Sequence, residues 1–208
     1  MLLPSLCAIV DVDAAARAGW PAVDLARAFL DGGARFLQIR AKQLASGALL
    51  ELCDAIVSLA RPVGGIVIVN DRVDLARLSD AAGVHVGQDD LPPSLARAQL
   101  GDAAVIGYST HTTAQLEASR VEPATYTAVG PIFGSVTKET GYDAVGLDLV
   151  TAAVRIVAGR PVVAIGGITL ENAPSVIAAG AASVAVIGDL LRGGAPDARV
   201  RAFLRVLS

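Results

Sequence analysis

The stretch GIVIVNDRVDLARLSDAAGVHVGQDDLPP, residues 65–93, contains one complete strand–helix–strand unit. Residues 66–69 form a short apolar run rich in β-branched side chains, which is typical of a buried strand. A helix is expected from about Val73 to Ser79, and a second short strand from Val84 to Val86. Two strands separated by a helix predict a unit of parallel α/β sheet, because parallel strands need a crossover connection.

Acidic residues follow both strands of this unit. Asp71 comes after the first strand, beside Asn70, and Asp90 follows the second. Since parallel strands end on one edge, both carboxylates would lie on one face, an arrangement that suits Mg²⁺ with water and substrate phosphates. Each acid has an ordinary alternative: Asp71 with Asp74 resembles a helix N-cap, and Asp89-Asp90 before two prolines resembles a turn. The pair on consecutive strands favours the metal site.

The alternation of strand and helix continues through the whole chain. Eight units in 208 residues average roughly 26 residues each, close to the lower size limit of a (β/α)₈ barrel. A doubly wound sheet of eight strands is the alternative. Strand signals remain evenly spaced to the end, and polar residues follow strands 2 to 8, so we predict a single-domain α/β protein, a (β/α)₈ TIM barrel over residues 1–208. The expected strands are residues 6–10, 35–40, 66–69, 84–86, 103–107, 125–129, 162–165 and 183–187.

Composition and charge exclude several classes of protein. A net charge of -3 argues against a nucleic-acid-binding surface. No apolar run approaches the roughly 18 residues of a membrane span, and the N-terminus lacks the basic segment of a signal peptide. Cys7 and Cys53 lie in apolar surroundings without metal-ligand spacing, as reduced core cysteines do. These features predict a cytoplasmic protein, and they leave open whether it forms a homo-oligomer.

Cationic side chains gather where strands end. Only two of the 17 basic residues are lysines, Lys42 and Lys138, and both lie at strand ends or in polar loops. In the second strand, Gln38, Arg40 and Lys42 alternate with apolar residues and share one face. A surface edge strand and solvated lysines are the alternatives. Cations on one face of a strand end in so apolar a chain favour an anionic ligand.

Hydroxyls and glycines follow the later strands. Ser109 precedes a helix expected from Thr113, where it would suit a phosphate or simply cap the helix. Gly166-Gly167 and Gly188 follow strands 7 and 8, the place where barrels often bind phosphate, and they have no Cβ to block its approach. The loop from 130 to about 144 is long enough to be functional.

From the residues alone, the site has three parts. The acidic pair with Asn70 and nearby cations describes a diphosphate site, and the glycine loops describe a monophosphate site. Gln38, Ser135 and Thr137 lie between them. No Ser-His-Asp or Cys-His arrangement is visible, so we expect departure of a diphosphate assisted by charge neutralisation rather than covalent catalysis.

Six ordered motifs resemble the thiamine-phosphate synthase family over nearly the whole chain. They are QIRAK (38–42), NDRVDLA (70–76), GVHVGQDDLP (83–92), GYSTH (107–111), VGPIFGSVTK (129–138) and AIGGI (164–168). The resemblance implies a (β/α)₈ barrel that joins hydroxymethylpyrimidine diphosphate to thiazole phosphate and releases pyrophosphate by a dissociative substitution. It implies that Mg²⁺ is held by Asp71 and Asp90. The implied diphosphate ligands are Arg40, Lys42, Asn70, Ser109 and Lys138, of which Lys138, Arg40 and Ser109 are the catalytic residues. Gln38 would bind the pyrimidine, and the thiazole phosphate would be bound by Ser135, Thr137, Gly167, Ile187 and Gly188.

The chain departs from the family pattern at one place, and two other functions are alternatives to the synthase. The family loop usually carries Pro-Thr where this chain has Gly134-Ser135, which retains the hydroxyl and loses the rigidity of the proline. A thiazole tautomerase of the same fold is one alternative, and the intact diphosphate residues argue against it. A non-catalytic sensor of thiamine intermediates is the other, and no degraded site residue or added segment supports it.

Overall fold

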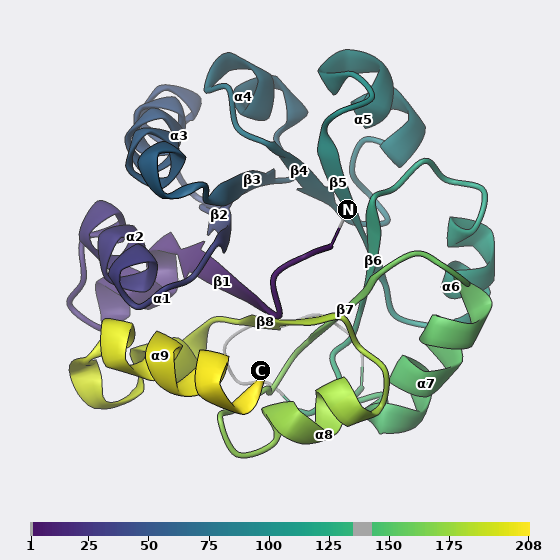
Figure 1. Cartoon of the computed structure of the whole chain (residues 1–208). Coiled ribbons are helices and arrows are strands. Elements are labelled where there is room, and N and C mark those ends of the chain that lie inside the picture. The colour runs from purple at the N-terminus through teal and green to yellow at the C-terminus, as the bar shows by residue number, and fades with distance from the viewer. Residues whose placement is uncertain (1, 135–142) are drawn as a thin grey trace.

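The structure, a computed structural model, describes residues 2–134 and 143–208. In this part of the chain eight strands form a closed barrel, β1-β2-β3-β4-β5-β6-β7-β8, in which each strand pairs in parallel with the next and β8 pairs with β1 (Figure 1). The closed ring confirms the barrel and excludes the doubly wound sheet. The strands are β1 (Leu6–Asp11), β2 (Phe36–Arg40), β3 (Ile66–Asn70), β4 (Gly83–Val86), β5 (Val105–Thr110), β6 (Tyr126–Val129), β7 (Val162–Ile165) and β8 (Ser183–Val186).

Helices surround the barrel on its outside (Figure 1). Three described elements were not predicted from the sequence: a short helix directly after β1, a short 3₁₀ segment after α3, and a 3₁₀ segment after β8. The helices are α1 (Val12–Arg17), α2 (Ala22–Asp31), α3 (Ser46–Ala60), α4 (Val73–Leu78), α5 (Pro93–Leu100), α6 (Thr113–Ser119), α7 (Gly146–Ile156), α8 (Ala173–Ala178) and α9 (Pro196–Val206), with 3₁₀ segments η1 (Arg61–Val63) and η2 (Gly188–Gly194). None of the described helices is long and apolar enough to cross a bilayer.

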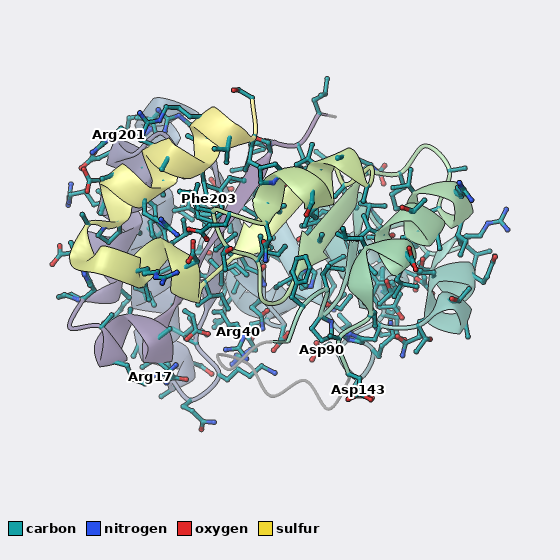
Figure 2. All side chains as sticks on the ribbon, turned by 90° about the horizontal axis from the view of Figure 1, so that it is seen from below. Arg17, Arg40, Asp90, Asp143, Arg201 and Phe203 are labelled. Atoms are coloured by element: carbon teal, nitrogen blue, oxygen red, sulfur yellow. The ribbon has the colours of Figure 1, made fainter. Side chains whose placement is uncertain are left out.

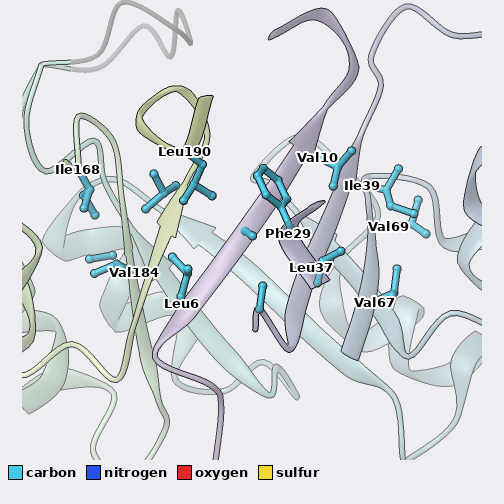
Figure 3. Close-up of a cluster of buried hydrophobic side chains, with 14 of the residues drawn as sticks. Leu6, Val10, Phe29, Leu37, Ile39, Val67, Val69, Ile168, Val184 and Leu190 are labelled. Atoms are coloured by element: carbon cyan, nitrogen blue, oxygen red, sulfur yellow. The ribbon is translucent and has the colours of Figure 1, made fainter. Parts of the chain in front are cut away.

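Strand alternation divides the core into two parts. Outward side chains such as Leu37, Ile39 and Val69 pack against the helices, for example beside Phe29 of α2 (Figure 3). Inward side chains such as Phe36 and Ile68 form a second cluster inside the barrel. Because strand side chains alternate, burying Leu37 and Ile39 outside turns the polar side chain of Gln38 into the barrel.

Among the element boundaries that differ from the expected ones, two have a clear local cause. β5 extends to Thr110, because Ser109 and Thr110 pair with β6 and the Thr110 hydroxyl donates to the Ala128 carbonyl. After β7, helix α8 begins only at Ala173. The preceding turn is closed by the Asn172 side chain, which accepts from the Thr169 backbone N–H at 2.8 Å.

At the amino ends of the strands, arginine side chains donate hydrogen bonds to backbone carbonyls of the connecting segments. Arg35 donates to the Leu30 and Ala34 carbonyls. Arg97 donates to backbone carbonyls in the segments that lead into β5 and β6. Arg160, just before β7, donates to the Ser119 and Glu122 carbonyls at and after the end of α6. These guanidinium groups pair backbone acceptors that neither helix nor sheet satisfies.

Candidate active site at the carboxyl ends of the strands

Asp71 and Asp90 come together just past β3 and β4. The Asp71 backbone N–H donates to the His85 carbonyl at 2.8 Å, and Asp71 has a positive φ of 62°. The Asp90 side chain accepts from the Gly87 N–H at 2.7 Å. The N-cap alternative for Asp71 is wrong, because Arg72 occupies the position before α4 and no side chain caps this helix.

The electrostatics of the acidic pair favour a cation between them. Burial and the neighbouring charge of Asp90 raise the pKa of Asp71 to about 6, while Lys42 and Arg40 act in the opposite direction. The Lys42 ammonium lies 3.7 Å from the Asp71 carboxylate. Two carboxylates that disfavour each other's charge suit a divalent ion. No third His, Cys, Asp or Glu of the described residues joins them, so the protein would supply two ligands and leave the others to water and substrate.

Arg40 reaches this edge from β2 and is held by a residue that sequence reasoning missed. It forms an ion pair with Asp11 at the end of β1; their side chains are 14% and 4% exposed. The other Asp11 oxygen accepts from the Ala14 N–H at 2.8 Å and caps α1. Figure 2 shows Arg40 and Asp90 at the same end of the molecule.

A small cavity lined by polar and apolar residues lies below this edge, inside the barrel. Five of the predicted site residues line it: Gln38, Arg40, Asn70, Ser109 and Ile187. The Gln38 side-chain N–H donates to the Asn70 side-chain oxygen at 2.7 Å. The amide pair is therefore oriented before any ligand binds.

His85 and Tyr126 complete this cavity and were also missed from sequence. His85 Nδ1 lies 2.8 Å from the Tyr126 hydroxyl, and its Nε2 lies 2.8 Å from the Ser109 hydroxyl. Burial raises the pKa of Tyr126 well above its usual range, so the phenol is neutral and can donate. The sequence signal for this chain of contacts is the small Gly107, since a Cβ there would overlap both rings.

A second cavity of about 520 Å³ opens at the ends of β5 to β8. Gly166, Gly167, Ile187 and Gly188 line it, and it shares Ser109 and Ile187 with the small cavity. Gly167 has a φ of 65°, and a Cβ there would lie 2.6 Å from the Gly134 carbonyl. The glycine is therefore required by packing and backbone conformation, in addition to access for a ligand.

The predicted residues Ser135, Thr137 and Lys138 lie outside the described residues. The exchange of Pro-Thr for Gly134-Ser135 falls at the edge of the same segment. The η2 residues Asp189, Leu191 and Arg192 line the large cavity and were not predicted.

A closed parallel barrel with a carboxylate pair, cations and glycine loops at its strand ends defines a (β/α)₈ enzyme of the class that handles phosphorylated substrates. Comparison with known proteins then gives the family. The profile of thiamine monophosphate synthase matches residues 6–190. The chain belongs to this family, and its activity is that of a thiamine-phosphate synthase, a transferase of thiamine biosynthesis.

Individual relatives agree over most of their length. A thiamine-phosphate synthase of Koribacter versatilis is 43% identical over 209 residues, with 99% of this chain and 96% of the relative covered. One of Roseiflexus castenholzii is 42% identical over 184 residues, covering 88% and 80%. The solved structure of a thiamine phosphate pyrophosphorylase from Pyrococcus furiosus superposes with a TM-score of 0.87 at 28% identity, covering 98% of this chain and 95% of that one.

Proposed function

We propose that the chain condenses 4-amino-2-methyl-5-hydroxymethylpyrimidine diphosphate with thiazole phosphate, giving thiamine phosphate and pyrophosphate. The observation that carries this proposal is the pair of adjoining cavities that share Ser109 and Ile187. One cavity lies beside the acidic pair and the cations, and the other is lined by the glycine loops. Two phosphorylated substrates can thus meet with their reacting atoms between the two anionic groups.

The small cavity, about 20 Å³, is too small for the pyrimidine ring itself, so its polar side chains would bind the edge of the ring from below. Because Gln38 donates to Asn70, the Gln38 side-chain oxygen remains to accept from the pyrimidine amino group. The Asn70 side-chain N–H₂ remains to donate to a diphosphate oxygen. If Tyr126 donates to His85 Nδ1, then His85 Nε2–H donates to Ser109, and the Ser109 hydroxyl proton is turned towards the diphosphate.

The diphosphate leaves with the electron pair of its carbon–oxygen bond, and the thiazole nitrogen forms the new carbon–nitrogen bond. Arg40, Lys42 and Ser109 would stabilise the charge on the leaving group, and the resemblance adds Lys138. The carboxylates of Asp71 and Asp90 would hold Mg²⁺, which when bound supplies further neutralisation of the diphosphate. The electron-rich aminopyrimidine supports the cationic carbon between departure and capture.

The same proposal places the chain in the cytoplasm with two small molecules as its partners. Cys7 and Cys53 are free and buried. Burial, together with the nearby charge of Asp54, raises the pKa of Cys53 to about 11, so this thiol is unreactive. Free, inert thiols support a reducing compartment.

The test is a turnover assay of the purified protein with both substrates, with and without Mg²⁺. We expect equal amounts of pyrophosphate and thiamine phosphate, only when Mg²⁺ is present. Asp71→Ala and Lys138→Ala should lower the rate on the order of 10²–10³-fold. The exposed Asp31→Ala at the end of α2 is the matched control and should stay within about threefold. Losses below about threefold for both site variants would contradict the assigned roles, and binding without products would contradict the reaction.

A further inference from the structure

The segment η2 brings a cation to the large cavity. Of the described residues that line this cavity, Arg192 alone carries a permanent positive charge. Gly188 and Ile187, which line the same cavity, lie four and five residues before Arg192 in the loop after β8. Arg40 and Lys42 lie by contrast at the acidic pair, beside the small cavity. The part of the large cavity that receives the monophosphate therefore has its own guanidinium group.

The backbone of η2 directs Arg192 out of the helical path. Arg192 has an extended conformation with φ -66° and ψ 130°, and Gly193 follows in the left-handed region with φ 81°. The 3₁₀ segment is therefore broken at the arginine. The sequence does not predict this break, since it indicates the closing helix only near residues 198–207.

Asp189 anchors the base of this segment. Its carboxylate is 6% exposed and accepts from the Arg199 guanidinium at 2.6 Å and from the Leu170 backbone N–H at 3.0 Å. Arg199 is itself held over the Phe203 ring of α9. The negative charge of Asp189 is thus largely compensated by Arg199, and the carboxylate ties η2 to α9 and to the loop after β7.

Arg192 lies near Asp189 but does not form a close ion pair with it. Its guanidinium lies 3.9 Å from the second Asp189 oxygen, a loose contact, and its side chain is 71% exposed. A planar guanidinium presents several donors and binds phosphate in a bidentate way. Donors that solvent can reach beside a phosphate loop are available for an incoming dianion.

We propose that Arg192 binds the phosphate of the thiazole substrate and makes the enzyme select the phosphorylated over the unphosphorylated thiazole. This inference rests on the proposed function, because it assigns a residue to the monophosphate part of that site. The backbone N–H groups of the glycine loops would bind and orient the phosphate. The positive charge of Arg192 adds an attraction for the phosphate dianion that the neutral alcohol lacks. Asp189 and Arg199 act as positioning residues, since they hold η2 without touching the substrate.

The experiment compares Arg192→Ala, Arg192→Gln and Arg192→Lys with the wild-type enzyme on two acceptors, thiazole phosphate and the corresponding thiazole alcohol. We expect KM for thiazole phosphate to rise roughly 10- to 100-fold in the Ala and Gln variants and less in the Lys variant. KM for the alcohol and for the pyrimidine diphosphate should change less than about threefold. Arg155→Ala, an exposed arginine on α7, is the matched control and should behave as wild type.

Two outcomes would overturn the inference: an unchanged KM for thiazole phosphate, or an equal rise for the phosphate and the alcohol. A thermal melt of each variant separates loss of binding from loss of fold. Calorimetric binding of thiazole phosphate to wild type and Arg192→Ala gives the same comparison without turnover. A wild-type enzyme that binds thiazole phosphate but makes no product would refute the proposed reaction alone, whereas a wild-type enzyme that turns over with an unaffected Arg192→Ala variant would refute only the role of Arg192.

Discussion

Asp11 and Arg40 are direct partners in the register between β1 and β2, and they form an ion pair at the carboxyl end of the barrel. The pair is almost completely buried, and its acid also caps α1. Arg40 is therefore presented to the site by a rigid element of the barrel rather than by a flexible side chain alone.

Neutralising Asp11 should cost both stability and rate. In Asp11→Asn the Arg40 charge loses its partner in a poorly solvated place, so the free energy of unfolding should fall by about 3 kcal/mol. The double variant Asp11→Asn/Arg40→Gln should regain part of that stability while remaining inactive, because no unpaired charge is left. Urea denaturation measures both. An Asp11→Asn variant within about 0.5 kcal/mol of wild type would show that the pair does not matter to the fold.

The raised pKa of Asp71 predicts the pH dependence of metal binding. Burial and Asp90 raise this pKa to about 6, so the carboxylate takes up a proton as the pH falls below that value. Bound protons compete with Mg²⁺, and the affinity at about pH 5 should be roughly tenfold weaker than at pH 7. It should level off above about pH 7. Calorimetric Mg²⁺ titrations across this range provide the measurement.

The same shift has a defined sign for the stability of the metal-free protein. The folded state keeps the Asp71 proton to a higher pH than the unfolded state, whose pKa lies near the ordinary 3.8. This group therefore stabilises the fold at low pH, and its contribution is lost as the pH rises from about 4 through about 6. Asp71→Asn should remove that part of the profile. Asp74→Asn is the control, since the hydrogen bond from Arg72 lowers the pKa of Asp74 and this variant should not remove the loss of stability between about pH 4 and 6. If Asp71→Asn left the dependence of stability on pH unchanged, the raised pKa of Asp71 would be contradicted.

A methyl group at Gly107 should disturb the centre of the barrel. A Cβ there would overlap the Tyr126 phenol and the His85 ring, so Gly107→Ala should lower the free energy of unfolding by about 2–3 kcal/mol. It should also slow turnover, since His85 contacts Ser109. Gly47→Ala on α3 meets no atom within 4 Å and should instead be neutral or raise stability by roughly 0.5 kcal/mol. Equal melting temperatures for the two variants would refute the packing argument.

Removing Arg160 should weaken the fold and leave the chemistry intact. Its guanidinium donates to the Ser119 and Glu122 carbonyls at 2.7 Å each. Arg160→Ala should cost about 1–3 kcal/mol in unfolding free energy, because the Glu122 carbonyl loses this donor and the Ser119 carbonyl keeps only the Glu122 backbone N–H. The value of kcat/KM below the melting range should stay within about twofold of wild type. Arg155→Ala is again the control, and a large loss of kcat/KM in Arg160→Ala would place this residue in the catalytic machinery.

The sequence predicted the features that depend on one strand at a time. Alternation in β2 placed Gln38 on the inner face, and the polar residues after β3 and β4 placed Asp71 and Asp90 at one edge. The missed residues depend on relations between strands. Asp11 reaches Arg40 through its register with β2, and the contact between His85 and Tyr126 exists only because Gly107 on the intervening strand has no side chain. Arg192 depends on a break in η2 that no periodicity reveals.

The arginines at the amino ends of the strands bear on which substitutions this chain can accept without loss of its fold. Arg35, Arg97 and Arg160 hold the connecting backbone at one end of the barrel, while the substrates would meet at the other. These three arginines therefore contribute to the fold without contacting the residues of the proposed site. Substitutions in η2 and in the loops after β7 and β8 can therefore change which thiazole acceptor is preferred. The contacts of the three arginines at the other end of the barrel would remain as they are.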